Sequence, residues 1–131
     1  MMGVSMRVLV IRPFGRFQRR ERIKDAALCE AVARVERGLV DADLGHGLIK
    51  QRVARPGQGR SGGYRAVIPY RARDRAVFLY GFAKSDRDNI DPDELQTFRE
   101  IGASWLMGDE QAIERAIGDE ILREVDCDDE A

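Results

Sequence analysis

The segment 48–82 constrains the fold most, because its side chains follow the period of β-strands rather than that of helices. The pattern predicts three strands, over residues 48–55, 64–71 and 76–82. The first two alternate in character, and the third is apolar on both faces, as a central buried strand would be. A glycine-rich loop and a turn at Arg73 and Asp74 connect them. Pro69 cannot donate a ladder hydrogen bond, so the second strand is expected to have an edge position or an irregular end.

The remaining elements flank these three strands along the chain. A strand over 8–11, a short helix from Pro13, a helix from Asp25 to Gly38 and a loop at 38–47 precede them. A helix from Asp91 to Gly108, an acidic helix over 109–117, and either a brief strand or a partner-binding tail over 121–125 follow them. The order β-α-α-β-β-β-α-α predicts an α+β domain with a small, mostly antiparallel β-sheet and helices packed on one face.

The chain is expected to form one domain over residues 1–131, because this length is usual for a single domain and no internal repeat is visible. Residues 1–5 are expected to be a disordered leader. Residues 109–131 are expected to be an acidic C-terminal extension of the domain.

The charges are strongly divided along the chain, although the net charge is only −1. Residues 1–84 contain 18 Lys and Arg against 7 Asp and Glu, a net charge of +11, whereas residues 85–131 contain 4 against 16, a net charge of −12. A basic cluster on a fold attracts phosphates through counterion release. The alternative is that the acidic part folds back and neutralises the basic part, and both can hold together.

The composition also bears on compartment and cofactors. The chain contains no run of about 18 apolar residues that would span a membrane, and its N-terminus lacks the apolar stretch of a signal peptide. Cys29 and Cys127 have no metal-ligand spacing, and a single histidine cannot complete a zinc site with them. We therefore expect two free thiols, no metal or other cofactor, and a cytoplasmic protein.

Cations gather in and around the predicted strands, at Lys50, Arg52, Arg55, Arg60, Arg65, Lys84 and Arg87. Lys50 and Arg52 share one face of the first strand, and Arg65 begins the second. Arginine suits bidentate contacts to phosphate, and Tyr64 could stack on a base, as aromatic side chains do in single-strand binding. This pattern indicates a phosphate-binding face; the alternative is a solvated charged face with Tyr64 packed half-buried.

Several motifs in this region resemble the RelE toxins of bacterial toxin–antitoxin pairs. Ser-Gly-Gly-Tyr-Arg at 61–65, the charged turn at 73–75 and Ala-Lys-Ser-Asp-Arg-Asp-Asn-Ile at 83–90 resemble the RelE core. Gly-Leu-Ile-Lys-Gln-Arg at 47–52, continuing to Gly59, and Phe-Leu-Tyr-Gly-Phe-Ala-Lys at 78–84 resemble a HigB-like branch, as does the helix at 26–38. The resemblance covers about residues 7–125.

The resemblance implies a RelE-like fold and the toxin of a type II toxin–antitoxin system. Such toxins are mRNA interferases, endonucleases that cut mRNA on the ribosome, and a cognate antitoxin, here expected to be of the helix-turn-helix type, silences them. The implied reaction needs no metal: a 2′-hydroxyl attacks the adjacent phosphorus and the 5′-oxygen leaves. The resemblance assigns transition-state charge to Arg65 and phosphate positioning to Arg52. The catalytic set that it implies is Lys50, Arg52, Arg65 and Lys84, and it adds Arg87 to the RNA-binding candidates that the charge pattern indicates, which are Arg55, Arg60 and Tyr64.

Two positions depart from the RelE pattern, because Ser85 stands where RelE has a catalytic arginine and Asp91 stands near its tyrosine. The acid and base of RelE therefore do not transfer. The candidates for proton transfer are Lys50, if neighbouring cations favour its neutral form, together with Asp88 and His46. Asp91 is expected to cap the next helix, because it directly precedes a proline.

Two other functions compete with the interferase. A catalytically inactive module of the same fold would bind RNA or an antitoxin without cutting RNA. A ParE-like toxin would act on gyrase instead, although the clustered cations favour RNA.

Overall fold

The computed structural model describes residues 6–55, 63–87 and 89–127. The predicted leader, Arg60 and Asp88 lie outside these described residues. The elements are β1 (Arg7–Ile11), α1 (Arg12–Glu21), α2 (Asp25–Glu36), β2 (Ala42–Gly45), β3 (Leu48–Val53), β4 (Tyr64–Arg71), β5 (Arg75–Phe78), β6 (Tyr80–Ala83), α3 (Pro92–Met107), α4 (Glu110–Gly118) and β7 (Leu122–Val125). The sequence prediction missed β2 and took β5 and β6 for one strand.

The strands form a seven-stranded sheet in the order β2-β3-β4-β5-β1-β7, with β6 also paired to β4. Among the described pairs, β1 and β5 are parallel and the others are antiparallel. β4 pairs with β6 through its first half and with β5 through Tyr70 and Arg71. Between β5 and β6, the Leu79 N–H donates to the Val67 carbonyl at 3.0 Å, so the two strands follow each other along one side of β4.

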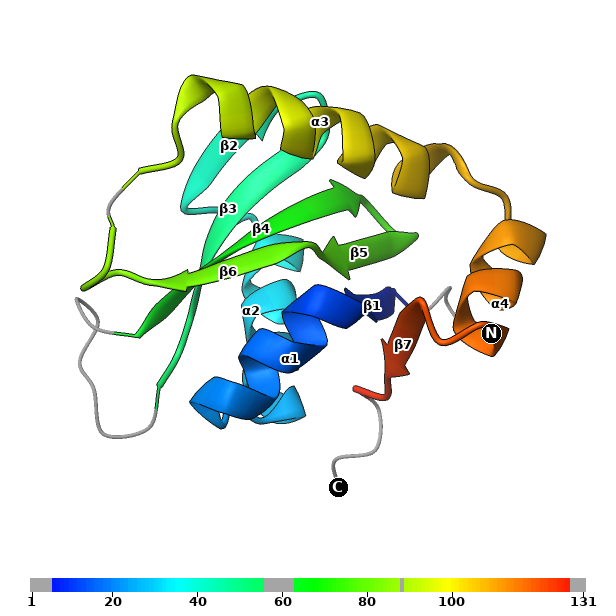
Figure 1. Ribbon diagram of the computed structural model, residues 1–131, viewed down its shortest axis with the longest axis horizontal. Coiled ribbons are helices and arrows are strands. Elements are labelled where there is room, and N and C mark those ends of the chain that lie inside the picture. Colours follow the sequence, from blue (N-terminus) through cyan, green and yellow to red (C-terminus); the bar gives the residue numbers. More distant parts are fainter. Residues whose placement is uncertain (1–5, 56–62, 88, 128–131) are drawn as a thin grey trace.

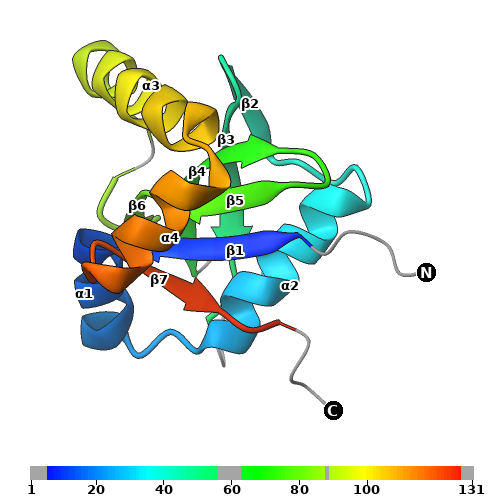
Figure 2. The ribbon, with the colours of Figure 1, turned by 90° about the vertical axis from the view of Figure 1, so that its right-hand side faces the viewer.

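Helices cover both faces of this sheet (Figures 1 and 2). α1 and α2 pack on one face, which we call the α1/α2 face, against side chains that include Val8, Val10 and Phe78. α3 and α4 pack on the opposite, α3/α4 face, where Leu9 and Val77 are buried. The α+β class is confirmed, but the helices divide between two faces instead of packing on one. The reason is that β1 and β5 bury apolar residues in both directions, so each face needs a cover.

The close approach of α1 to β6 depends on Gly81. A Cβ atom at Gly81 would lie 2.5 Å from a ring carbon of Phe17 and 2.9 Å from one of Phe14. Because side chains alternate along a strand, the neighbours of Gly81, Tyr80 and Phe82, are directed to the α3/α4 face.

A tight turn joins β2 to β3 inside the segment that the sequence predicts to be a loop. Gly45, His46 and Gly47 have φ angles of 83°, 58° and 79°, a left-handed run that reverses the chain abruptly. The prediction missed β2 because it is short and only partly buried, so its period is weak.

The C-terminal segment is built into the domain through both packing and charge. β7 pairs with β1, and Ile113 and Ala116 of α4 are buried against Leu9. The Arg7 guanidinium binds Glu110, Glu114 and Glu124 at 2.6–2.8 Å, which raises its pKa, and the buried Arg75 binds Glu110 at 2.9 Å. Of the two alternatives for residues 121–125, the strand is confirmed. The acidic part therefore neutralises some cations of the basic part.

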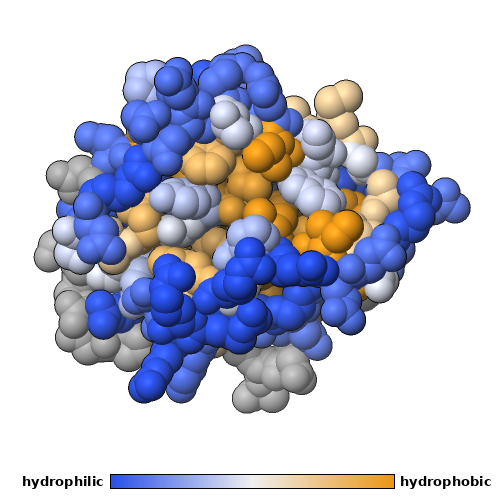
Figure 3. Space-filling view, in the orientation of Figure 1, coloured by the Kyte–Doolittle hydropathy of each residue, from blue (hydrophilic) through white to orange (hydrophobic). Residues whose placement is uncertain are grey.

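Exposed apolar side chains gather between α3 and α1 (Figure 3). Ile11, Ile101, Trp105 and Ile121 contribute to a groove of about 300 Å³ there, and the side chains of Ile101 and Ile121 are 40% and 45% exposed. The apolar lining of this groove distinguishes it from the phosphate-binding face that the sequence predicts.

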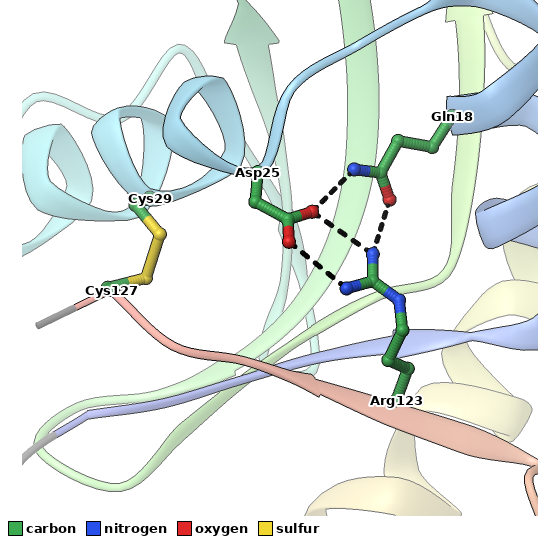
Figure 4. The surroundings of a disulfide bond; sticks show 5 residues. All are labelled: Gln18, Asp25, Cys29, Arg123 and Cys127. Atoms are coloured by element: carbon green, nitrogen blue, oxygen red, sulfur yellow. Dashed lines mark hydrogen bonds and ion pairs between the residues drawn. A yellow bond between two sulfur atoms is a disulfide. The ribbon is translucent and has the colours of Figure 1, made fainter. Parts of the chain in front are cut away.

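The two cysteines form a disulfide bond, so the prediction of free thiols was wrong. Cys29 lies on α2 and Cys127 just beyond β7, and their Cα atoms are 5.6 Å apart although 98 positions separate them (Figure 4). The spacing of two cysteines along a sequence cannot show that β7 returns to the side of α2. One argument for a reducing compartment is thereby lost, because disulfides are rare in the cytosol.

An ion pair beside the disulfide also joins β7 to α2 (Figure 4). Both terminal nitrogens of Arg123 donate to the Asp25 carboxylate at 3.1 Å, and the Gln18 amide donates to it at 2.7 Å. These contacts, chiefly the hydrogen bonds from Arg123, hold the pKa of Asp25 below its ordinary value of 3.8. Asp25 is the first residue of α2 rather than its N-cap, which is Lys24.

This pair predicts part of the pH dependence of stability. Because the pKa of Asp25 is lower in the folded state, its carboxylate contributes stability above the unfolded-state value, and this contribution is lost as the pH falls below about 3.8. We expect Asp25→Asn to reduce the loss of unfolding free energy between pH 6 and pH 3, as measured by urea unfolding. An unchanged pH dependence in this variant would contradict the prediction; Asp86→Asn, in the exposed turn after β6, is the control.

Candidate nucleic-acid interface

Three of the predicted cations lie together on the α3/α4 face of β3 and β4. In the register of these strands Arg52 is directly opposite Arg65, and Lys50 is opposite Val67. Val67 is buried on the α3/α4 face, so the alternation of side chains places Lys50, Arg52 and Arg65 on that same face. We call these three residues the cationic cluster.

The cationic cluster lies next to the part of the sheet that α3 covers. α3 packs over Leu48, Val67 and Leu79, further along the same face. The three cluster residues are each partly exposed. None of them forms an ion pair with a carboxylate within the described part of the chain; the Arg65 side chain donates only to the carbonyl of Tyr64, at 3.2 Å. Two facing arginines would repel each other, so the arrangement suits an anion that binds both.

A second group of polar side chains borders this face where β6 leads towards α3. Arg87 donates to the Glu94 carboxylate, which raises the pKa of Arg87 and lowers that of Glu94. Arg87 also donates to the Tyr80 hydroxyl at 3.1 Å and lies over the rings of Tyr80 and Phe82, 5.9 and 5.6 Å from their centroids. Glu94 additionally completes a capping box with Asp91. Arg87 is therefore fixed by an ion pair, whereas the residues of the cationic cluster form none within the described part of the chain.

The expected cap at Asp91 is confirmed. Its side chain accepts from the Glu94 N–H at 3.0 Å, and Pro92 follows as the first residue of α3. Ser85, the other departure from the RelE pattern, is exposed in the turn after β6.

Tyr64 does not have the exposed ring that stacking on a base would require. Its side chain is 1% exposed on the α1/α2 face, its ring meets Phe17 edge-on at 5.6 Å, and its hydroxyl donates to Glu21 at 3.0 Å. Burial, together with Glu21, raises the pKa of this hydroxyl. The prediction that Tyr64 stacks on a base was therefore wrong. α1 covers the Tyr64 ring, and the strand pattern alone could not show this cover.

The other predicted residues are placed at different distances from the cationic cluster. Lys84 is exposed next to the start of β4, where its backbone N–H donates to the Gly63 carbonyl at 3.3 Å. Arg55 lies over the Tyr64 ring, 5.4 Å from its centroid, and therefore on the side of the α1/α2 face. His46 is in the β2–β3 turn, at the opposite end of β3 from Arg52 and about 20 Å away along the strand. This separation removes His46 as a base for a reaction at Arg52 and Arg65.

Tyr80 is the residue of this region that the sequence analysis missed. Its strand was interpreted as buried on both faces, so its hydroxyl was not considered. The signal that could have found it is the alternation of Tyr80, Gly81 and Phe82, which places the two aromatic rings on one side.

Within the described ranges, no three His, Cys, Asp or Glu side chains are grouped so that they could hold a metal ion. None of the helices in the same ranges combines the length and the hydrophobicity that a membrane-spanning segment requires.

Comparison with known proteins gives one finding about the family. A family model described as the RelE toxin of the RelE/RelB toxin–antitoxin system matches residues 6–125. No curated protein matches the chain. The matched segment contains every strand and helix from β1 to β7 and the three residues of the cationic cluster.

Proposed function

Because the chain belongs to the RelE toxin family, we propose that it is an RNA endonuclease that cleaves ribosome-bound mRNA. Toxins of this family pair with an antitoxin. In this proposal the protein is the toxin of a type II pair, of the HigB-like branch, and it acts in the cytoplasm, where translated mRNA is found. Its partners are mRNA, the ribosome and an antitoxin of the helix-turn-helix type.

The observation that carries the proposal is the pairing of Arg52 with Arg65 on a partly exposed face. Neighbouring strands are about 4.8 Å apart, so two guanidinium groups from paired positions can hold the oxygens of one phosphate. Lys50 lies one side-chain repeat away along β3, about 7 Å, which is close to the spacing of successive phosphates in an extended strand of RNA.

The proposed reaction is transesterification within the RNA strand. A base removes the proton of a 2′-hydroxyl, the 2′-oxygen forms a bond to the adjacent phosphorus, and the bond from phosphorus to the 5′-oxygen breaks. The products are a 2′,3′-cyclic phosphate and a 5′-hydroxyl. Negative charge grows on the non-bridging oxygens in the transition state, and Arg52 and Arg65 stabilise it there. Lys84, exposed beside the start of β4, adds positive charge at the edge of this site.

The first test is to express the protein from a tightly repressed promoter in a heterologous bacterium and map mRNA 5′ ends within minutes of induction. We expect growth arrest and new 5′ ends inside translated codons. An Arg52→Ala strain should grow and lack these ends, whereas Arg37→Ala, at the exposed end of α2, should behave as the parent. Growth arrest with intact mRNA would contradict the proposal, and DNA damage instead would indicate a gyrase-directed toxin.

A catalytically inactive RNA- or antitoxin-binding module is the second candidate, and the departures from the RelE pattern favour it. Ser85 supplies no charge, and Asp91 is occupied as a helix cap. Such a module would bind RNA with an affinity that falls steeply with salt, and it would release no cleavage product. Normal growth with a folded, RNA-binding protein would identify it.

A further inference from the structure

Tyr80 lies in a row with Lys50 across three strands. β4 pairs Val67 with Lys50 on one side and with Tyr80 on the other, and it pairs Arg65 with Arg52 and Phe82 in the neighbouring row. All of these side chains alternate to the α3/α4 face. At about 4.8 Å per strand, the Cα atoms of Lys50 and Tyr80 are about 10 Å apart, with Val67 between them and with Arg52 and Arg65 in the neighbouring row. This distance can be bridged by a phosphodiester and the two long side chains.

The phenol of Tyr80 is held in a fixed position at this face. Its ring stacks on Phe98 of α3, with ring centroids 5.0 Å apart and an angle of 29° between the planes, and packs with Val67 and Leu79. Arg87 donates a hydrogen bond to the hydroxyl oxygen at 3.1 Å, and Glu94 fixes Arg87. The Tyr80 oxygen accepts from Arg87, so its own proton is free to be donated to another acceptor.

Few other side chains near the cationic cluster can give up a proton. Glu94 is paired with Arg87, Asp91 caps α3, and His46 lies at the far end of β3. Guanidinium groups do not release protons in proteins. Among the described residues beside the cationic cluster, Lys50, Lys84 and Tyr80 can donate a proton, and Tyr80 is the one of these three whose position is fixed by ring stacking and a side-chain hydrogen bond.

We propose that Tyr80 is the general acid of the cleavage reaction, an assignment that rests on the proposed endonuclease function. As the bond from phosphorus to the 5′-oxygen breaks, the hydroxyl proton of Tyr80 passes to that oxygen, which leaves as a 5′-hydroxyl. The electron pair of the O–H bond stays on Tyr80 as a phenolate, and the N–H of Arg87 stabilises its charge. Water returns the proton after release of the product. Arg87 is a positioning residue in this scheme, because it acts through Tyr80.

The test measures single-turnover cleavage of mRNA on programmed ribosomes by the parent and by Tyr80→Phe. We expect the variant to cleave about 100- to 10,000-fold more slowly, with little change in half-saturating ribosome concentration. Tyr70→Phe is the matched control, because Tyr70 packs on the α1/α2 face, and it should cleave as the parent. Thermal unfolding should confirm that both variants fold.

A substrate with sulfur in place of the bridging 5′-oxygen separates an acid from a structural residue. A thiolate leaves without protonation, so Tyr80→Phe should cleave this substrate as fast as the parent, while Arg65→Ala should stay slow. Tyr80 is not the acid if Tyr80→Phe cleaves the ordinary substrate at the parent rate, or if the sulfur substrate does not restore the cleavage rate of this variant. In either case the endonuclease proposal stands. If the parent itself cleaves neither substrate, both proposals fall.

Discussion

Arg65→Ala is expected to lower the single-turnover rate of mRNA cleavage by about 100- to 1,000-fold, the usual effect of removing one preorganised group that stabilises transition-state charge. Arg65 stands opposite Arg52 on the face that we assign to RNA, and its side chain forms no ion pair within the described residues. Its removal therefore breaks no ion pair among the described residues. Arg65→Lys should restore only part of the rate, because lysine keeps the charge but cannot bind two phosphate oxygens through a planar fork.

The matched control for Arg65→Ala is Arg20→Ala, which removes one positive charge from α1, where the Arg20 side chain is 67% exposed. If net charge alone attracts RNA, both variants should lose affinity and become less sensitive to salt to the same extent. The proposed role requires Arg65→Ala to lose the rate of the chemical step while Arg20→Ala retains it. Equal cleavage rates for the parent and Arg65→Ala would remove the cationic cluster from the reaction.

Reduction of the disulfide between Cys29 and Cys127 is expected to lower the free energy of unfolding by about 2–4 kcal/mol. The bond spans 98 positions, so it restricts a large part of the unfolded chain, and the chain-entropy estimate for such a loop is about 4.7 kcal/mol. Urea unfolding with and without reductant measures the difference. The variant Cys29→Ser/Cys127→Ser should match the reduced parent and should not respond to reductant.

Reaction with a thiol reagent provides the independent measurement. The oxidised, denatured protein should contain no titratable thiol, and the reduced protein should contain two. Two reactive thiols in protein purified under oxidising conditions, with no effect of reductant on unfolding, would contradict the disulfide. RNA cleavage should change little on reduction, because the bond joins α2 to the end of β7, whereas the cationic cluster lies on the opposite face of the sheet.

The local patterns of the sequence predicted the strands around the candidate site well. Tyr64–Arg71 has the bounds predicted for it, and the alternation in β3 correctly separated Lys50 and Arg52 from Ile49 and Val53. The residue preferences at helix ends were equally informative at Pro13 and Asp91. These features are local: backbone geometry fixes where successive side chains point, and capping needs only neighbours within one turn.

The identity of the side chains that meet at the site depended on contacts between distant residues. Strand register placed Arg65 beside Arg52 and Tyr80 in the row of Lys50, and the period of one strand does not give its register, which also depends on the connecting turn and on the buried face of the partner strand. α1 covered Tyr64, although Tyr64 and Arg65 occupy the same predicted strand. The sequence alone thus determined the period, and so the direction, of each side chain within its strand. Only the tertiary structure decided which of these side chains were covered, paired or left open, and which two cysteines met, because those outcomes depend on how segments far apart in the chain pack together.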